Sequence, residues 1–517
     1  MPLFMPKNTP PDTLRPAKGT HQELELKLAL PASRPDQLLA QLARTPVLAR
    51  RHATHLRLHN TYYDTPDQAL RQQRIALRIR RLELNGQAQW LQTLKTAPRN
   101  DSALSLRGEW ETPLPAPTLD WQALQNTPWP HIDPEGTLFA SLAPCFVTAF
   151  ERTVWQVRRR DGSAVEVALD IGHILSGGHT APLCELELEL KAGPPQALFE
   201  VAAQIARTLA VLPISASKAE RGYALAAGTL HAPRWAQPVP LRPRLPLPEA
   251  ARRVLHEAFH QFTHNLQALR SANDPELTHQ ARIGWRRLHT ALRLFKSVLT
   301  PPSWQPLEPM LAFLGELRDL EVALNDTLPP LANAYAGGQA QREQAWQAMV
   351  QALQAAAQLQ RKALRYALDQ PALGAALLAT TQWLEADTLC TPAPRRQLPP
   401  LRAWAKHRIT RLRARWLRAL KLSQQTNDPQ SQHRSRLLAK RLRYSMEALH
   451  KLLPRQQRAQ RWQQQALQFQ TRIGSQRDME RAVVLVSGLD ISPSLVDFLR
   501  GVALGMKPPE ARSPPKG

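Results

Sequence analysis

Hydrophobic and polar residues alternate along several segments of the first 230 residues. In HQELELKLAL, residues 21–30, leucines fill the even positions from 24, and Glu23, Glu25 and Lys27 stand between them. Successive side chains of a strand point to opposite faces, so this segment predicts a strand with one apolar and one charged face. Similar patterns, with Asn85-Gly86 as a hairpin turn, predict further strands at 55–64, 73–84, 87–95, 105–111, 145–158, 164–177 and 183–193. Since only 34–44 has helical spacing among them, we expect a mainly antiparallel sheet of about eight strands.

A proline-rich stretch separates this region from a helical one. Residues 231–248, HAPRWAQPVPLRPRLPLP, favour an extended spacer because proline lacks the backbone donor. Beyond it, long Leu/Ala/Gln/Arg segments with prolines only at breaks predict helices. The expected fold is therefore α+β, and the expected organisation is a disordered tail at 1–19, a β domain at 20–228, a linker at 229–248, an all-α bundle at 249–503 and a disordered tail at 504–517.

The helical part contains an internal repeat, which predicts two similar halves. One pattern, His-x2-Arg-x3-Arg-Arg from residue 279, recurs as His-x2-Arg-x3-Lys-Arg from residue 433. A second, Gly-x2-Arg-Asp-x-Glu from residue 315, recurs in the same order from residue 474. On a helix, positions i, i+3 and i+7 form one stripe, so each copy of the first pattern places a histidine and several cations along one ridge.

Charge is distributed unequally between the two parts. Residues 1–230 hold 25 basic and 22 acidic residues, a formal charge of +3, and residues 231–517 hold 42 and 20, a charge of +22. This predicts a polyanionic partner for the second part: nucleic acid, an acidic membrane surface or polyphosphate. Three widely spaced cysteines match neither a disulfide framework nor a zinc pattern, so a reducing cytoplasm is the expected setting. No 18 apolar residues run together, so no membrane span is expected.

Charges of one sign cluster on the faces of several predicted strands. Arg78 and Arg80 share a face, and Glu185, Glu187 and Glu189 share another. Like charges at i and i+2 lie about 7 Å apart and cost roughly 2 kcal/mol per pair at an effective dielectric near 20. A solvated sheet face is the ordinary interpretation of one such segment. Segregated acidic and basic strands instead predict one site, with carboxylates for divalent cations and basic groups for phosphates.

These residues carry a resemblance to a known family. Glu23-Leu-Glu25-Leu-Lys27 resembles the ExExK signature of the CYTH family, the triphosphate tunnel metalloenzymes. Further motifs follow this signature in the family's order over about 20–228 and make the resemblance specific. They are Tyr62-Tyr63-Asp64-Thr65-Pro66-Asp67, Leu77-Arg78-Ile79-Arg80, Leu94-Lys95-Thr96, Arg107 with Glu109, Phe150-Glu151-Arg152, Ala168-Leu169-Asp170-Ile171-Gly172, Glu185 to Lys191, and Ser217 to Tyr223. The family's eight-stranded antiparallel barrel turns its charged face into a tunnel.

The resemblance implies a triphosphate site with Mg²⁺ or Mn²⁺. The residues it implies for substrate binding are Lys27, Arg78, Arg80, Lys95, Arg107, Arg152, Lys191, Lys218 and Arg221. Those it implies for metal binding are Glu23, Glu25, Asp170, Glu185, Glu187 and Glu189, with the choice among the last three left open. The expected catalytic set is Glu23, Glu25, Lys27, Arg78 and Arg80, in which a carboxylate or a second metal orients the attacking water.

The repeated helical pattern resembles the CHAD domain, an α-helical module of two similar four-helix halves, over about 249–500. The resemblance implies binding of polyphosphate along both basic ridges, and the matched residues, beside Tyr444, are His279, Arg282, Arg286, Arg287, His433, Arg436, Lys440, Arg441 and Arg443. A nucleic-acid partner stays open, because Trp404 and Trp416 stand among arginines as stacking residues do.

Together, the two resemblances predict hydrolysis of inorganic triphosphate to diphosphate and phosphate, with the second domain localising the enzyme on polyphosphate, including polyphosphate granules. One alternative is a polyphosphate-binding protein with little turnover. The others are different CYTH activities, adenylate cyclisation or hydrolysis of thiamine triphosphate. Neither of these needs a polyphosphate-binding partner domain, so the fusion favours the first hypothesis.

Overall fold

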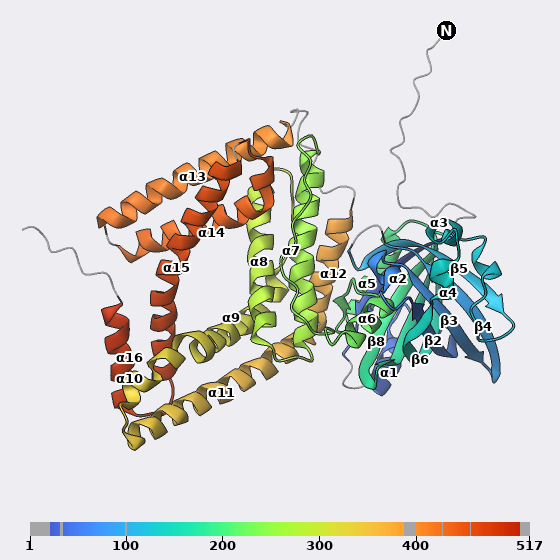
Figure 1. Cartoon of the computed structure of the whole chain (residues 1–517), viewed down its shortest axis with the longest axis horizontal. Coiled ribbons are helices and arrows are strands. Elements are labelled where there is room, and N and C mark those ends of the chain that lie inside the picture. The colour runs from blue at the N-terminus through green and yellow to red at the C-terminus, as the bar shows by residue number, and fades with distance from the viewer. Residues whose placement is uncertain are drawn as a thin grey trace, which may run out of the picture. The chain divides into compact units, whose positions relative to one another are not determined.

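The computed structural model describes residues 21–31, 35–98, 101–386, 399–426, 428–454 and 456–506 (Figure 1). The expected tail at 1–19 and residues 507–517 of the expected C-terminal tail lie outside the described residues. The contacts between Cα atoms divide the chain into two compact units. The first joins the described residues up to Ala232 with Asp369–Glu385, and the second comprises Pro233–Leu368 and the residues from Ala386 onward.

The first unit contains a closed eight-stranded antiparallel barrel, which confirms the expected fold. Its strand order is β5-β4-β3-β2-β6-β7-β8-β1, and β1 closes the barrel by pairing with β5. A short strand, β9 (Leu212–Pro213), pairs with the end of β1. The eight strands are β1 (Gln22–Ala29), β2 (Ala53–Asp64), β3 (Ala76–Leu84), β4 (Gln87–Lys95), β5 (Leu104–Leu114), β6 (Ala143–Arg158), β7 (Ala164–Ser176) and β8 (His179–Ala192).

The apolar faces of the strands point outward, under helices. Leu24, Leu26 and Leu28 of β1 are at most 1% exposed and belong to one core with residues of α1 (Pro35–Arg44) and α5 (Gln196–Ala206). The charged residues between the leucines consequently point into the barrel, as the resemblance implied. The shorter helices of this unit are α2 (Ala69–Gln72), α3 (Trp129–Ile132), α4 (Thr137–Ala140) and α6 (Lys218–Ala226).

One helix of the first unit comes from the middle of the helical part of the sequence. Helix α12 (Pro371–Glu385) packs against α5 and β9, and Leu378, 2% exposed, belongs to the core beneath α5. Gly374 permits this contact, since a Cβ there would lie 2.3 Å from the carbonyl oxygen of Val211. Residues within the expected domain at 249–503 thus complete the outer layer of the barrel unit.

The second unit is helical and has two similar halves. Helix α8 packs against α14 and α9 against α15, so the two copies of each repeated pattern are neighbours (Figure 1). The likeness includes the helix starts: Asp274 and Asp428 cap α8 and α14, and each is followed by a proline. The helices are α7 (Leu247–Leu269), α8 (Pro275–Phe295), α9 (Glu308–Val322), α10 (Ala332–Ala336), α11 (Ala340–Leu368), α13 (Leu401–Thr426), α14 (Pro429–Leu449), α15 (Gln456–Ser487) and α16 (Pro493–Gly505). No helix in the described part of the chain is long and apolar enough to span a membrane.

Candidate functional site

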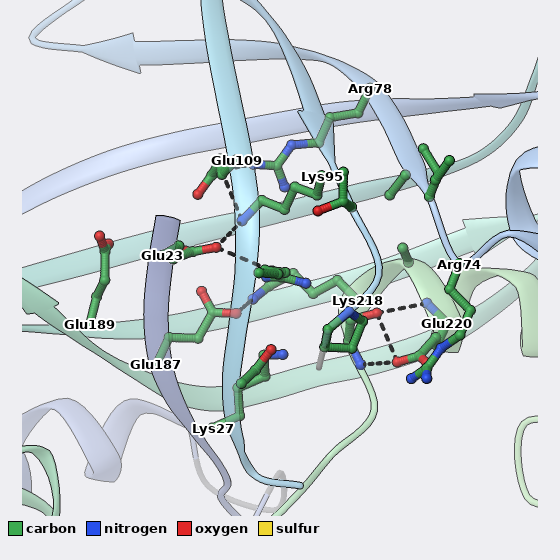
Figure 2. Close-up of a pocket in the computed structure, with 18 of the residues that line it drawn as sticks. Glu23, Lys27, Arg74, Arg78, Lys95, Glu109, Glu187, Glu189, Lys218 and Glu220 are labelled. Carbon is green, nitrogen blue, oxygen red and sulfur yellow. Dashed lines mark hydrogen bonds and ion pairs between the residues drawn. The ribbon is translucent and has the colours of Figure 1, made fainter. Parts of the chain in front are cut away.

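A charged cavity of about 580 Å³ lies inside the barrel, and all eight strands contribute to its lining (Figure 2). The basic residues that line it are Lys27, Arg71, Arg74, Arg78, Arg80, Lys95, Arg107, Arg152, Lys191 and Lys218. The acidic ones are Glu23, Glu109, Glu111, Glu166, Glu187, Glu189 and Glu220. The barrel therefore brings together most of the residues that the resemblance implied. Glu25, Asp170 and Glu185 contact lining residues from beside the cavity, and Arg221 contacts Glu185.

Arg78 lines the cavity with part of its guanidinium group unsatisfied. The side chain is 6% exposed, and its Nη1 donates a hydrogen bond to the hydroxyl oxygen of Tyr62 at 3.2 Å. Its Nη2 lies 3.7 Å from Glu109 and 3.8 Å from Glu111, beyond hydrogen-bond distance, and neither Nη2 nor Nε has a hydrogen-bond partner among the described residues. A buried donor without an acceptor is costly, so this arginine is set to receive an anion.

Arg80 lies beside Arg78 in the same cavity. Its Nε donates to the amide oxygen of Asn60 at 2.9 Å, and its Nη1 lies 3.1 Å from Glu111. Burial and the neighbouring Arg78 lower the pKa of Arg80 to about 10. A phosphate bound by both guanidinium groups would reverse this effect, because an opposite charge favours the ionised form.

Glu23 of β1 links two cations on nearby strands, Arg107 of β5 and Lys95 of β4. Its carboxylate lies 2.9 Å from Lys95 Nζ and 3.2 Å from Arg107 Nε, and Lys95 also reaches Glu109 at 2.9 Å (Figure 2). Burial acts to raise the pKa of Glu23, but Lys95 and Arg107 outweigh it and hold that pKa well below its usual range. The carboxylate is therefore ionised at neutral pH and can act as a metal ligand.

A second carboxylate group surrounds Lys218, the first residue of α6. Its Nζ lies 2.7 Å from Asp170, 2.5 Å from Glu185 and 2.8 Å from Glu187, and oxygens of these three acids lie within 4.8 Å of one another. Arg152 binds Asp170 through two hydrogen bonds of 2.7 Å and Glu187 through one of 2.6 Å, and Arg221 lies 2.8 Å from Glu185. These three acids are thus already neutralised by protein cations.

Glu189 is less fully compensated. It lies directly opposite Glu25 in the pairing of β1 with β8, and its partner is Lys191 at 2.6 Å. Burial, followed by repulsion from Glu23, raises the pKa of Glu189 to about 7. Glu25 itself is 2% exposed and lies 2.9 Å from Lys27 and 2.5 Å from Arg107. Buried carboxylates that repel one another suit a divalent cation, which prefers oxygen ligands and would relieve that repulsion.

The cavity also contains residues that were not selected from the sequence. Glu109 and Glu111 accompany Arg78, Arg80 and Lys95, and their signal was present, because they continue the alternation from Arg107 along one strand face. Arg74 was missed because it falls in the predicted strand at 73–84, whereas β3 begins only at Ala76. Its backbone is left-handed, with φ 57°, and its side chain lies 2.6 Å from Asp101.

In the helical unit, the two repeats bring cations together. The pKa of Lys440 falls to about 7 because the side chain is partly buried and lies near four arginines. Burial and Arg286 likewise lower the pKa of Arg282 to about 10. We call the following set, drawn from α8, α14 and α15, the central basic cluster: Arg282, Arg286, Arg436, Lys440 and Arg477. Arg477 was not selected from the sequence, although it belongs to the second repeated pattern.

The other residues selected in the repeats occupy different surroundings. His279 is half-buried near Arg318 and Arg286, whereas His433 is exposed. The remaining three selected arginines, Arg287, Arg441 and Arg443, lie outside the central basic cluster. Arg287 lies 3.7 Å and Arg443 3.9 Å from Glu447, with Arg443 also over the ring of Tyr444, and Arg441 lies near Arg293 and Arg415.

The fold and cavity define a charged tunnel barrel joined to a basic helical module, and comparison with known proteins agrees. Residues 21–223 match the model of the CYTH domain, and residues 253–486 match that of the CHAD domain. The chain thus carries a CYTH domain followed by a CHAD domain, as the sequence motifs indicated.

Individual relatives match parts of the chain. An inorganic triphosphatase from Haemophilus influenzae is 37% identical over 204 residues, which are 40% of this chain and 55% of that protein, so the match spans just over half of the relative. A crystal structure of the CHAD domain from the plant Ricinus communis is 28% identical, covers 53% of this chain and 91% of that one, and has a TM-score of 0.46. A putative adenylyl cyclase from Hippeastrum, described as having a dominant triphosphatase activity, is 20% identical over 39% of this chain and 95% of its own, with a TM-score of 0.29.

Proposed function

We propose that this protein hydrolyses inorganic triphosphate to diphosphate and phosphate in the barrel, with the help of a divalent metal ion, and binds polyphosphate through its helical unit. The observation that carries the first part is Arg78. It lines a cavity with ten basic side chains, and its buried Nε and Nη2 have no hydrogen-bond partner among the described residues. The name of the Haemophilus influenzae relative supports inorganic triphosphate as the substrate.

The barrel residues bind and orient the substrate. A triphosphate carries about four to five negative charges, which must be neutralised before water can approach in line. Arg78 and Arg80 would hold one phosphate from β3, and Lys95 and Arg107 would hold another once they turn from Glu23. Lys27 on β1, Arg152 on β6 and Lys218 at the start of α6 would supply further positive charge. Arg221 and Lys191 lie outside this set, one beside Glu185 and the other 40% exposed.

The metal would be held by Glu23, Glu25 and Glu189, by their oxygens on adjacent strands. These residues fit a hard cation such as Mg²⁺ or Mn²⁺, because they are carboxylates and because Glu189 carries unrelieved repulsion. Such an ion, when bound, neutralises phosphate oxygens and makes bound water more acidic. We assign Asp170, Glu185 and Glu187 to the support of Lys218, Arg152 and Arg221, because Lys218 Nζ alone lies 2.5 to 2.8 Å from all three acids and so takes the place that a metal ion would have among them.

Polyphosphate binding is supported by the central basic cluster. Five cations crowd together at the junction of the two repeats, and burial together with repulsion from the other four lowers the pKa of Lys440 to about 7. A polyanion would remove that repulsion and release counterions. Binding of this kind in the cytoplasm would place the hydrolase on polyphosphate granules.

The decisive experiment measures phosphate release from tripolyphosphate, ATP and thiamine triphosphate with Mg²⁺, Mn²⁺ or a chelator. We expect a strong preference for tripolyphosphate and loss of release in the chelator. Arg78→Ala should lower turnover by about 100-fold or more, the usual effect of removing a preorganised donor. The matched control is Arg57→Ala, since Arg57 is 73% exposed and should leave the rate unchanged. Comparable hydrolysis of ATP would overturn the proposal.

A further inference from the structure

A second basic hollow, of about 760 Å³, lies in the helical unit away from the central basic cluster. Four cations line it: Arg402 at the start of α13, Lys451 after α14, and Arg458 and Arg461 at the start of α15. The rest of its lining is Pro243, Leu452, Leu453, Pro454 and Gln457. The lining thus combines four cations with mainly apolar residues, and no acid among the residues that the structure describes lines the hollow.

The absence of acids from this lining follows from the sequence. Residues 399–427 and 448–477, which supply all of the lining except Pro243, contain no Asp or Glu. Arg402, Arg458 and Arg461 therefore have no carboxylate within their own segments to pair with. Gln457 and Arg458 also stand in the first turn of the 32-residue helix α15, where the helix dipole adds positive potential. Both features favour an anionic ligand.

The lining also indicates which kind of anion suits the hollow. None of the described residues that line the hollow is aromatic. The nearby ring of Trp462 already contacts two guanidinium groups, Arg413 at 4.5 Å and Arg458 at 5.2 Å from its centroid. Single-stranded nucleic acid gains much of its affinity from bases stacked on such rings. A phosphate chain without bases needs only the cations, so the observations favour polyphosphate.

The hollow and the central basic cluster share one helix. Arg458 and Arg477 are 19 positions apart on α15, which corresponds to about 28 Å along its axis. We propose that the hollow is a second polyphosphate site, so that a long chain binds the hollow and the central basic cluster at once. This inference rests on the proposed polyphosphate binding, and it adds chain-length selectivity: tripolyphosphate is too short to reach both sites, whereas a long chain gains from the second contact at high effective concentration.

The test compares chain lengths in the full-length protein, by calorimetry in a chelator at fixed ionic strength. Arg458→Gln/Arg461→Gln should weaken binding of long-chain polyphosphate by tenfold or more and leave tripolyphosphate affinity at the central basic cluster unchanged. Arg286→Gln/Arg436→Gln should weaken both ligands. Arg402→Gln should weaken the long chain alone, and its control is Arg418→Gln, an exposed arginine sixteen positions further along α13.

The outcomes separate this inference from the function on which it rests. If the wild-type protein binds long chains but the hollow variants bind them as tightly as Arg418→Gln does, the second site is refuted and the central basic cluster is sufficient. If the wild-type protein binds no polyphosphate, the proposed binding function fails, and the second site with it. If the hollow variants lose affinity for a single-stranded oligonucleotide and not for polyphosphate, the hollow is a nucleic-acid site and the inference is overturned.

Discussion

Lys218 allows the sharpest test of how the barrel tolerates so many buried charges. Its side chain is 6% exposed, and its ammonium group contacts Asp170, Glu185 and Glu187 at 2.5 to 2.8 Å. Lys218→Ala would leave three acids, two of them fully buried, with Arg152 and Arg221 as their remaining ion-pair partners among the described residues. Removing one partner of a buried ion pair costs about 3–5 kcal/mol. Since the two arginines remain, we expect about 3 kcal/mol.

This loss should be visible in thermal unfolding of the full chain. For a unit of roughly 150–250 residues, 1 kcal/mol corresponds to about 2–4 °C, so the transition of the barrel unit should fall by about 6–12 °C at pH 7.5. Burial acts to lower the pKa of Lys218, but the three acids outweigh it and raise that pKa above its usual value. The stabilisation by Lys218 is therefore complete at neutral pH and is lost only as the pH rises through the folded pKa.

Acid pH should reduce the defect, because protonation of the abandoned acids removes their repulsion. The matched control is Lys191→Ala, whose side chain is 40% exposed and pairs with Glu189, so it should cost less than about 1 kcal/mol. Equal unfolding temperatures for Lys218→Ala and Lys191→Ala at pH 7.5 would refute the reasoning. A defect in Lys218→Ala that does not shrink between pH 7.5 and pH 5 would refute the electrostatic explanation.

Three further results are expected. Glu189→Gln should stabilise the barrel unit by about 1–2 kcal/mol at pH 8 and not below pH 4.5, as measured by thermal unfolding in a chelator. The reason is that an acid with a raised pKa destabilises the fold once it is ionised. The same variant should lose metal-dependent phosphate release. Leu378→Ala should lower the free energy of unfolding of the barrel unit by about 2–4 kcal/mol. Its control is Leu359→Ala, at a residue that is 66% exposed, which should change the free energy of unfolding by less than about 0.5 kcal/mol. Polyphosphate affinity, measured by calorimetry, should fall by roughly three- to tenfold from pH 6.5 to 8 as Lys440 loses its proton, and Lys440→Gln should abolish that dependence.

Each of these results has an outcome that contradicts its premise. A Glu189→Gln variant that is less stable at pH 8 would mean that the carboxylate is already compensated. Equal effects of the two leucine substitutions would mean that α12 contributes nothing to the barrel unit. Affinity that is flat with pH in the wild-type protein would remove Lys440 from the polyphosphate site.

Much of the barrel could be predicted because its pattern is local. Period-two alternation in β1 and β8 follows directly from strand geometry, and the turn at Asn85-Gly86 needs φ > 0, which both residues have at 52° and 79°. The alternation did not predict which residues lie opposite each other on neighbouring strands, because the pairing register depends on two segments and not on one. Only the register shows that Glu25 faces Glu189 and that Glu23 faces Arg107.

The helical unit shows the same division. The repeat predicted two similar halves, because the same side-chain stripe recurs on each helix. It did not separate Arg286, in the central basic cluster, from Arg287, which turns to Gln261 at 2.6 Å and to Glu447. Adjacent positions differ by about 100° around a helix axis, so the packing of neighbouring helices decides which one faces the shared surface.

The sequence by itself determined the alternation of the strands, the helical repeat, the segregation of charge and most of the chemical groups of the cavity, since these depend on neighbours within one segment. Only the tertiary structure decided which carboxylates are neutralised by protein cations, which arginine donors lack partners, and that α12, more than 150 residues beyond α5, covers the barrel. The physical reason is that the energy of a buried charge or an apolar face depends on what closure of the barrel and helix packing place beside it, and those partners come from distant parts of the chain.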